Sequence, residues 1–158
     1  MAKPEKTNVM RTLERLHIPY AEHFYGDTGA VSGVDVARVL GEDPAKTFKT
    51  LVTVAKSRQH YVFMIPVAEE LDLKKAAAAV GEKAVEMLKS KELLPLTGYV
   101  HGGCSPIGMK KQFRTLIHET AEGFDTILFS GGKIGCQVEC SLANLRQALP
   151  VESADLIV

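Results

Sequence analysis

Residues 46–67, KTFKTLVTVAKSRQHYVFMIPV, contain the longest strand-like run of the sequence. Lys46–Ala55 is rich in threonine and valine, and Tyr61–Val67 is again apolar and aromatic. The polar residues Lys56–His60 separate these two runs. Runs of β-branched and aromatic residues on either side of a polar turn are typical of a β-hairpin. We therefore expect a hairpin of two antiparallel strands.

Shorter helices and strands are predicted on both sides of this hairpin. Helical spacing and capping residues favour helices at 4–17, 34–40, 71–80, 89–94 (stopped by Pro95) and 141–149 (with Ser141 as N-cap). Further strands are expected at 20–25, 84–87, 114–118, 124–129 and 137–140. No repeat or linker divides the 158 residues. We expect a single domain over residues 1–158, α+β in class, with a mixed, strongly curved sheet and helices packed outside it.

The charges of the chain balance, with 19 basic and 19 acidic residues. This balance argues against broad electrostatic binding to nucleic acid such as DNA, although it leaves room for a local basic pocket. No apolar run approaches the roughly 18 residues that span a membrane. The first ten residues, MAKPEKTNVM, are too polar for a signal peptide. We expect a cytoplasmic protein that does not act at a membrane.

The glycine-rich stretch Thr97–Lys111, TGYVHGGCSPIGMKK, is a candidate binding loop. The pair Gly102-Gly103 allows a positive φ angle and the close approach of another group, because neither residue has a Cβ atom. Ser105-Pro106 fixes a bend. Such a loop can cradle an anion or a carbonyl oxygen with its backbone N–H groups. The alternative is a tight structural crossing between strands, and the stretch by itself leaves both interpretations open.

Two lysine-containing motifs are further candidates. Lys49 lies in the apolar run of the predicted hairpin, and strand alternation places it on the face opposite Phe48 and Thr50. It either faces solvent or points into a polar cleft, where it can hold a phosphate or carboxylate. Ser130–Gly135, SGGKIG, lacks the spacing of a phosphate-binding P-loop. It contains the G-x-x-G pattern that clamps RNA backbone in some modules, but a tight hairpin is the better interpretation of this stretch.

The sequence predicts no metal site and no cofactor. Cys136 and Cys140 are separated by a strand-like QVE, whereas zinc ligands favour a C-x₂-C turn. Cys104 has no evident base beside it to lower its pKa, and Ser105 lacks the G-x-S-x-G context of a nucleophilic serine. The three cysteines are expected to be reduced thiols that pack as small apolar groups.

Three motifs in order resemble the YbaK/EbsC family. These are FKTL at 48–51, TGYVHGGCSPIG at 97–108 followed by two lysines, and SGGKIG at 130–135; LDLKKAA at 71–77 and VEM at 85–87 are also similar. The resemblance covers about residues 9–149 and extends to the editing domain inserted in bacterial prolyl-tRNA synthetases. It implies a barrel-like mixed sheet surrounded by helices. It also implies hydrolysis, in trans, of Cys-tRNA(Pro), with aminoacylated tRNA as substrate and prolyl-tRNA synthetase as an associated partner.

The resemblance implies roles for individual residues. Lys49 would be the essential residue of catalysis, holding the phosphate of the terminal nucleotide or the 3′ end. Substrate-binding roles would fall to Tyr25, Thr50, Gly102, Gly103, Ser130, Gly132 and Gln137, the glycines acting through their N–H groups. In this family the cysteinyl thiol of the substrate attacks its own ester and forms a thiolactone, so that no nucleophile from the protein is needed.

Two departures bear on specificity. Close relatives carry phenylalanine at the position of Ser32, and aspartate or serine at the position of Gln137. These differences leave the aminoacyl group open. One alternative is another mischarged tRNA, such as Ala-tRNA, hydrolysed by a bound water molecule. The other is a non-catalytic module that binds tRNA or a synthetase.

Overall fold

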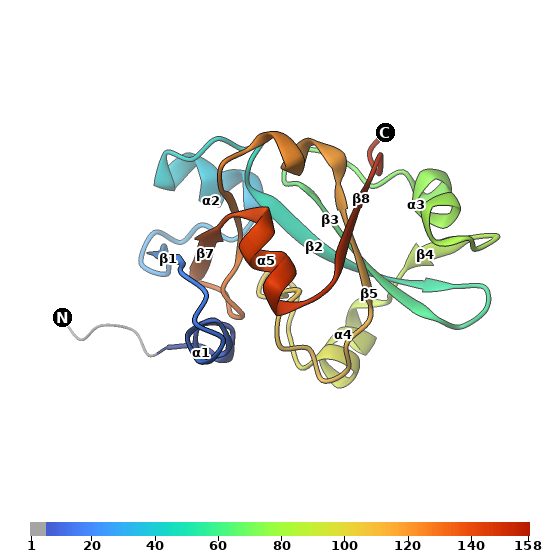
Figure 1. Cartoon of the computed structure of the whole chain (residues 1–158), viewed down its shortest axis with the longest axis horizontal. Helices are drawn as coiled ribbons and strands as arrows, with labels where there is room; N and C mark the ends of the chain where they lie inside the picture. Colours follow the sequence, from blue (N-terminus) through green and yellow to red (C-terminus); the bar gives the residue numbers. More distant parts are fainter. Residues whose placement is uncertain (1–5) are drawn as a thin grey trace.

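The computed structural model describes residues 6–158, which fold into two β-sheets with helices around them (Figure 1). The smaller sheet is antiparallel, with the strand order β1 (Ala21–Phe24), β7 (Cys136–Cys140), β6 (Ile127–Ser130). The larger sheet has the order β4 (Val85–Met87), β2 (Phe48–Ala55), β3 (His60–Pro66), β5 (Arg114–His118), β8 (Val151–Ala154). The predicted α+β class and mixed sheet are confirmed.

The predicted hairpin lies in the larger sheet as strands β2 and β3. Its register pairs Phe48 with Pro66 and Val54 with His60 in antiparallel fashion. Strands β5 and β8 then add in parallel to β3, which makes the sheet mixed. The strand β8 was not predicted. It is short, its two central residues Glu152 and Ser153 are exposed, and its pairing with β5 is a tertiary contact that leaves no local pattern.

The two sheets meet at the start of β2. Thr47 forms an isolated parallel bridge with Leu128 of β6, and the Leu128 N–H donates to the Lys46 carbonyl oxygen at 3.0 Å. The strands therefore wrap round from one sheet to the other. They do not close into one continuous barrel, since each sheet keeps its own pair of edges.

The helices lie outside the sheets and begin at polar capping residues. Their bounds are α1 Asn8–Arg15, α2 Gly33–Leu40, α3 Leu73–Val80, α4 Ser90–Thr97, α5 Leu142–Ala148 and the 3₁₀ helix η1 Glu119–Gly123. Thr7, Ser32, Asp72 and Ser141 each accept a backbone N–H as N-cap. The predicted start at Pro4 lies outside the described residues. Helix α3 starts two residues later than predicted because Leu71 is engaged in a bridge with Ile157.

Helix α4 corrects one prediction. Pro95 was expected to stop this helix, yet the helix continues to Thr97. A proline removes one N–H donor from a helix and crowds the preceding turn. Only two residues follow Pro95 in this short helix, and the Gly98 N–H, bonded to the Leu94 carbonyl at 2.9 Å, closes it.

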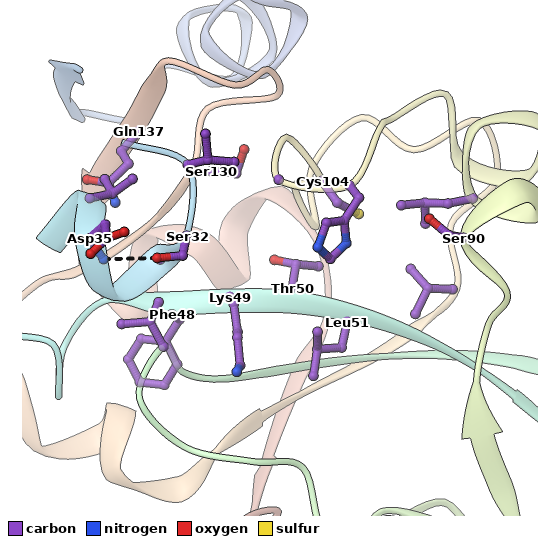
Figure 2. A pocket seen from close by; sticks show the side chains of 18 of the residues that line it. Ser32, Asp35, Phe48, Lys49, Thr50, Leu51, Ser90, Cys104, Ser130 and Gln137 are labelled. Carbon is purple, nitrogen blue, oxygen red and sulfur yellow. Dashed lines mark hydrogen bonds between the residues drawn. The ribbon is translucent and has the colours of Figure 1, made fainter. Parts of the chain in front are cut away.

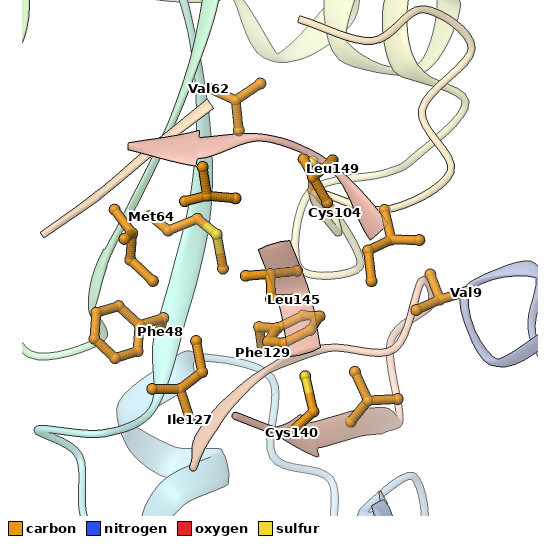
Figure 3. Packing of buried hydrophobic residues seen from close by; sticks show 14 of the residues in the cluster. Val9, Phe48, Val62, Met64, Cys104, Ile127, Phe129, Cys140, Leu145 and Leu149 are labelled. Atoms are coloured by element: carbon orange, nitrogen blue, oxygen red, sulfur yellow. The ribbon is translucent and has the colours of Figure 1, made fainter. Parts of the chain in front are cut away.

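Two buried clusters occupy the two faces of the larger sheet. Phe48 and Val52 of β2 share one face with Val62 and Met64 of β3, and this cluster extends to the smaller sheet and α5 (Figure 3). Leu51, Phe63 and Ile65 lie on the other face, against the alanines of α3. The predicted alternation of Phe48 and Lys49 between the faces is confirmed. Among residues 6–158, no helix is both long enough and apolar enough to cross a membrane.

Candidate functional site

A cavity of about 840 Å³ lies where the two sheets meet. Its walls come from the start of α2, the first half of β2, the β4–α4 segment, the glycine-rich loop and the ends of β6 and β7 (Figure 2). Six of the eight predicted site residues line it: Tyr25, Lys49, Thr50, Gly102, Ser130 and Gln137. Gly103 and Gly132 are not among its lining residues.

The cavity follows an open edge of β2. Strand β4 pairs with residues 53–55 of β2, and the Leu88 N–H still reaches the Val52 carbonyl oxygen at 3.0 Å. At the other end, β6 reaches Thr47. Between these two points, residues 48–51 have no strand partner on this side within the described chain. An unpaired edge presents backbone N–H and C=O groups to whatever lies beside it, so that the cavity borders both side chains and backbone.

Lys49 and Thr50 leave this edge in opposite directions (Figure 2). Thr50 lies on the side of Ser130 and Cys104, whereas Lys49 projects from the other face of the strand. Lys49 has no hydrogen bond or ion pair with any described residue. The Thr50 hydroxyl oxygen is shielded from solvent and also lacks a partner within residues 6–158. Because buried polar atoms are nearly always hydrogen-bonded, this hydroxyl is an unsatisfied polar atom in a residue that lines the cavity.

The glycine-rich loop brings one of its two central glycines to the cavity. Gly102 has a φ angle of 88° and lines the wall, and within the described chain its N–H has no hydrogen-bond partner. The neighbouring Gly103 donates its N–H to the Val100 carbonyl at 3.0 Å. A Cβ atom on Gly103 would lie 3.0 Å from the Ile134 nitrogen. Gly103 thus serves the close contact between two loops, which is the structural role that the sequence left open.

The second loop, Ser130–Gly135, is held in shape by its own first residue. Ser130 Oγ accepts the Gly132 N–H at 3.1 Å. Gly132 lies on the far side of the loop, where it borders a second hollow of about 320 Å³. Lys6, Arg11 and Lys133 also line this hollow, and none of its lining residues within 6–158 is a carboxylate. Ser130 therefore lines the main cavity, whereas Gly132 borders the second hollow.

Gln137 is held by a residue that the sequence did not single out. Gln137 is 6% exposed. One end of its side-chain amide lies 2.9 and 2.8 Å from the two carboxylate oxygens of Glu42, and assigning the nitrogen Nε2 to that end lets it donate to both. Burial raises the pKa of the Glu42 carboxyl group, while His23 and the hydrogen bond from Gln137 lower it. Glu42 follows the left-handed cap Gly41 of α2. Nothing in the local sequence distinguishes it from a surface glutamate.

The chain is similar to known proteins in both sequence and fold. A family model described as the aminoacyl-tRNA editing domain matches residues 28–148. The chain belongs to the aminoacyl-tRNA editing domain family. This match includes every residue named above as lining the main cavity except Tyr25. The resemblance to the YbaK/EbsC family is thereby confirmed.

Relatives of this editing domain agree in sequence and fold. A protein of Enterococcus faecalis (strain ATCC 700802 / V583), provisionally named Cys-tRNA(Pro)/Cys-tRNA(Cys) deacylase EbsC, is 48% identical over 136 residues, which are 85% of this chain and 83% of the relative. A crystal structure described provisionally as a trans-editing enzyme for prolyl-tRNA synthetase has a TM-score of 0.81 at 23% identity, covering 98% of this chain and 99% of that one. The hypothetical protein APE2540 has a TM-score of 0.86 at 19% identity, covering 95% and 99%.

The thiol in the cavity of this editing domain is a poor nucleophile. Cys104 is 7% exposed, and burial raises the pKa of its thiol to about 12. A thiol with this pKa stays protonated near neutral pH, and the thiolate is the reactive form. The described residues contain no group of three or more His, Cys, Asp or Glu side chains placed to hold a metal ion.

Proposed function

We propose that this editing domain is an aminoacyl-tRNA deacylase that removes cysteine from mischarged Cys-tRNA(Pro). The observation that carries the proposal is the meeting of Lys49, the unpartnered Thr50 hydroxyl and the Gly102 N–H around one cavity. The family match supports an aminoacyl ester as the ligand, and the relative from Enterococcus faecalis supports cysteine as the aminoacyl group. Cysteine is close to proline in size, so a synthetase pocket rejects it poorly and a second site is needed.

The reaction that we propose uses the substrate's own thiol. Its sulfur bonds to the ester carbonyl carbon, and the bond from that carbon to the tRNA 3′ oxygen breaks. The 3′ oxygen takes the proton that the thiol gives up, and water later opens the cyclic thiolactone to free cysteine. The protonated, buried Cys104 supports this route, because the protein then needs no nucleophile of its own.

The protein's part is to hold the two ends of the substrate. We place the aminoacyl group on the side of Thr50 and Gly102, where an N–H group can stabilise the oxyanion. Lys49, on the other face of the strand edge, then holds the nucleotide phosphate or the 3′ end as a point charge. Arg11 and Lys133, which line the second hollow, add local positive charge to a chain of zero net charge, which suits an RNA substrate.

The proposal also covers the domain organisation, the cellular location and the partner of the protein. We propose that residues 1–158 act as one domain, in trans, in the cytoplasm, and that prolyl-tRNA synthetase is an associated partner. We also propose that Tyr25, Thr50, Gly102, Ser130 and Gln137 bind the substrate. Gly103 and Gly132 contribute indirectly, through close contacts of their loops. Gly103 lies against Ile134 and Lys133, and Gly132 lies against Val9 and Tyr99.

Deacylation of tRNA(Pro) charged with different amino acids tests the proposed reaction. We expect the cysteinyl ester to be hydrolysed at least about 100-fold faster than the alanyl ester, because an intramolecular nucleophile has a very high effective concentration. The seryl ester is the matched control, since its hydroxyl has the same position but is a weaker nucleophile. Equal rates on cysteine and alanine esters would reject the thiol route and favour attack by a bound water molecule. No deacylation of any ester would favour a binding module.

The variant Cys104→Ser separates the substrate's thiol from the protein's. We expect it to keep more than about half of the wild-type kcat/KM on cysteinyl-tRNA(Pro), because a buried thiol whose pKa is about 12 supplies little thiolate. Circular dichroism and thermal unfolding check that the buried hydroxyl is tolerated. A folded Cys104→Ser protein without turnover would restore Cys104 as a nucleophile.

A further inference from the structure

Glu42 and Gln137 form a pair at the wall of the cavity. Gln137 lines the cavity from β7, and Glu42 lies behind it, on the segment between α2 and β2. One end of the Gln137 side-chain amide lies 2.9 and 2.8 Å from the two carboxylate oxygens. Because a carboxylate only accepts hydrogen bonds, it selects one of the two orientations of the amide. The nitrogen faces Glu42, and the carbonyl oxygen Oε1 faces the other way.

The surroundings keep this pair in place. Strand β1 pairs with β7, with His23 opposite Gln137. His23 Nε2 lies 2.9 Å from Glu139 Oε1, and Lys46 Nζ lies 3.5 Å from Glu139 Oε2. Lys46 also donates to Thr126 Oγ1 at 3.0 Å. Glu139 thus engages His23 and Lys46, while the Glu42 carboxylate faces the amide of Gln137.

A carbonyl oxygen backed in this way is selective for donors. Hydrogen bonds in a chain polarise one another, so an amide that donates to a carboxylate becomes a better acceptor at its oxygen. The ester oxygens and phosphates of a charged tRNA are acceptors and cannot pair with Oε1. The donors near the ester are the α-ammonium group, the thiol and the ribose hydroxyl. Of these the ammonium group is charged, and charge-assisted hydrogen bonds are the strongest.

We propose that Glu42 is a positioning residue that fixes the amide of Gln137 so that its Oε1 atom accepts a hydrogen bond from the α-ammonium group of the aminoacyl ester. This inference rests on the proposed deacylase function. It assigns Glu42 a role that reaches the substrate through another side chain. It also gives the departure at Gln137 a meaning, because glutamine with a carboxylate behind it can present an acceptor without adding a second negative charge to the cavity.

The test compares esters that differ at the amino group. Cysteinyl-tRNA(Pro) is compared with its N-acetyl form, which has lost the charge, and with its N-methyl form, which is larger but still charged. We expect the wild type to prefer the free amine over the N-acetyl ester by about 10- to 100-fold in kcat/KM, the usual effect of a hydrogen bond to a charged group. The N-methyl ester should lose less than about fivefold, because two N–H donors remain.

Variants then connect this preference to Glu42. In Glu42→Gln the amide of Gln137 can turn either way, so we expect the preference to fall to about threefold or less. Gln137→Met, which keeps the size and removes the acceptor, should do the same. Glu69→Gln, at an exposed position, is the control and should keep the wild-type ratio. Thermal unfolding of each variant shows that the ratio is read from folded protein.

The outcomes are distinct. A wild-type preference that survives in both Glu42→Gln and Gln137→Met would overturn the proposal, as would equal wild-type rates on the free and N-acetyl esters. A wild-type preference that survives in Glu42→Gln but is lost in Gln137→Met would assign the contact to Gln137 and overturn the role of Glu42. If the wild type hydrolyses none of the three esters, the proposed function itself fails, and the inference fails with it.

Discussion

Replacing Lys49 with alanine should lower kcat/KM on cysteinyl-tRNA(Pro) by about 100-fold or more, the scale of losing a polar group that contacts the reacting end. Lys49 projects from an unpaired strand edge at the cavity and has no partner among residues 6–158. A cation in that position is available to a phosphate or to the 3′ end. Because the fold does not use the ammonium group, the free energy of unfolding should change by only about 0.5 kcal/mol. Deacylation assays and thermal unfolding measure the two effects separately.

Two further variants make the Lys49 result specific. Lys56→Ala removes an equal charge from the exposed turn of the same hairpin, and we expect wild-type activity. Lys49→Arg keeps the charge but changes the shape of the donor, so its activity should fall between those of the wild type and Lys49→Ala. If folded Lys49→Ala retains the wild-type kcat/KM, Lys49 is not part of the site, and the cavity must bind its substrate through the Thr50 side alone.

Local sequence patterns predicted the hairpin and the position of its lysine. The two runs on either side of the polar turn became β2 and β3, with the expected alternation of Phe48, Lys49 and Thr50. Strand β5 has the predicted bounds, Arg114–His118. These features depend on neighbours within one strand or one turn. For that reason a period of two and a polar turn were enough to place them.

The remainder depended on contacts between distant segments. The contact between Glu42 and Gln137 and the pairing of β8 with β5 both join segments that are far apart in the sequence. Neither contact leaves a pattern in the local sequence. The glycine pair shows the same limit. Sequence predicts that Gly102-Gly103 permits a positive φ angle and a close approach, but only the fold assigns the φ angle to Gly102 and the close approach to Gly103. The sequence could not say which of them faces a ligand.

The contact at Gly103 leads to the second large expected effect. In Gly103→Ala the new Cβ atom would lie 3.0 Å from the Ile134 nitrogen and 3.0 and 3.1 Å from Lys133 Cα and C. These are backbone atoms, which cannot rotate away as a side chain can, so the two loops must separate. Overpacking of this kind costs about 1–3 kcal/mol. In a domain of this size the melting temperature should fall by about 2–4 °C for each kcal/mol.

The same substitution should also weaken deacylation, because Gly102 and Ser130 belong to the two loops that are forced apart. Gly123→Ala is the matched control: it adds the same methyl group at a position where no atom lies within 4 Å of the new Cβ. That variant should be neutral or up to about 1 kcal/mol more stable, since alanine restricts the unfolded chain. Equal melting temperatures for Gly103→Ala and Gly123→Ala would show that the loops can shift without cost. The glycine would then be needed for a ligand rather than for packing, which is the alternative that the contact at Ile134 argues against.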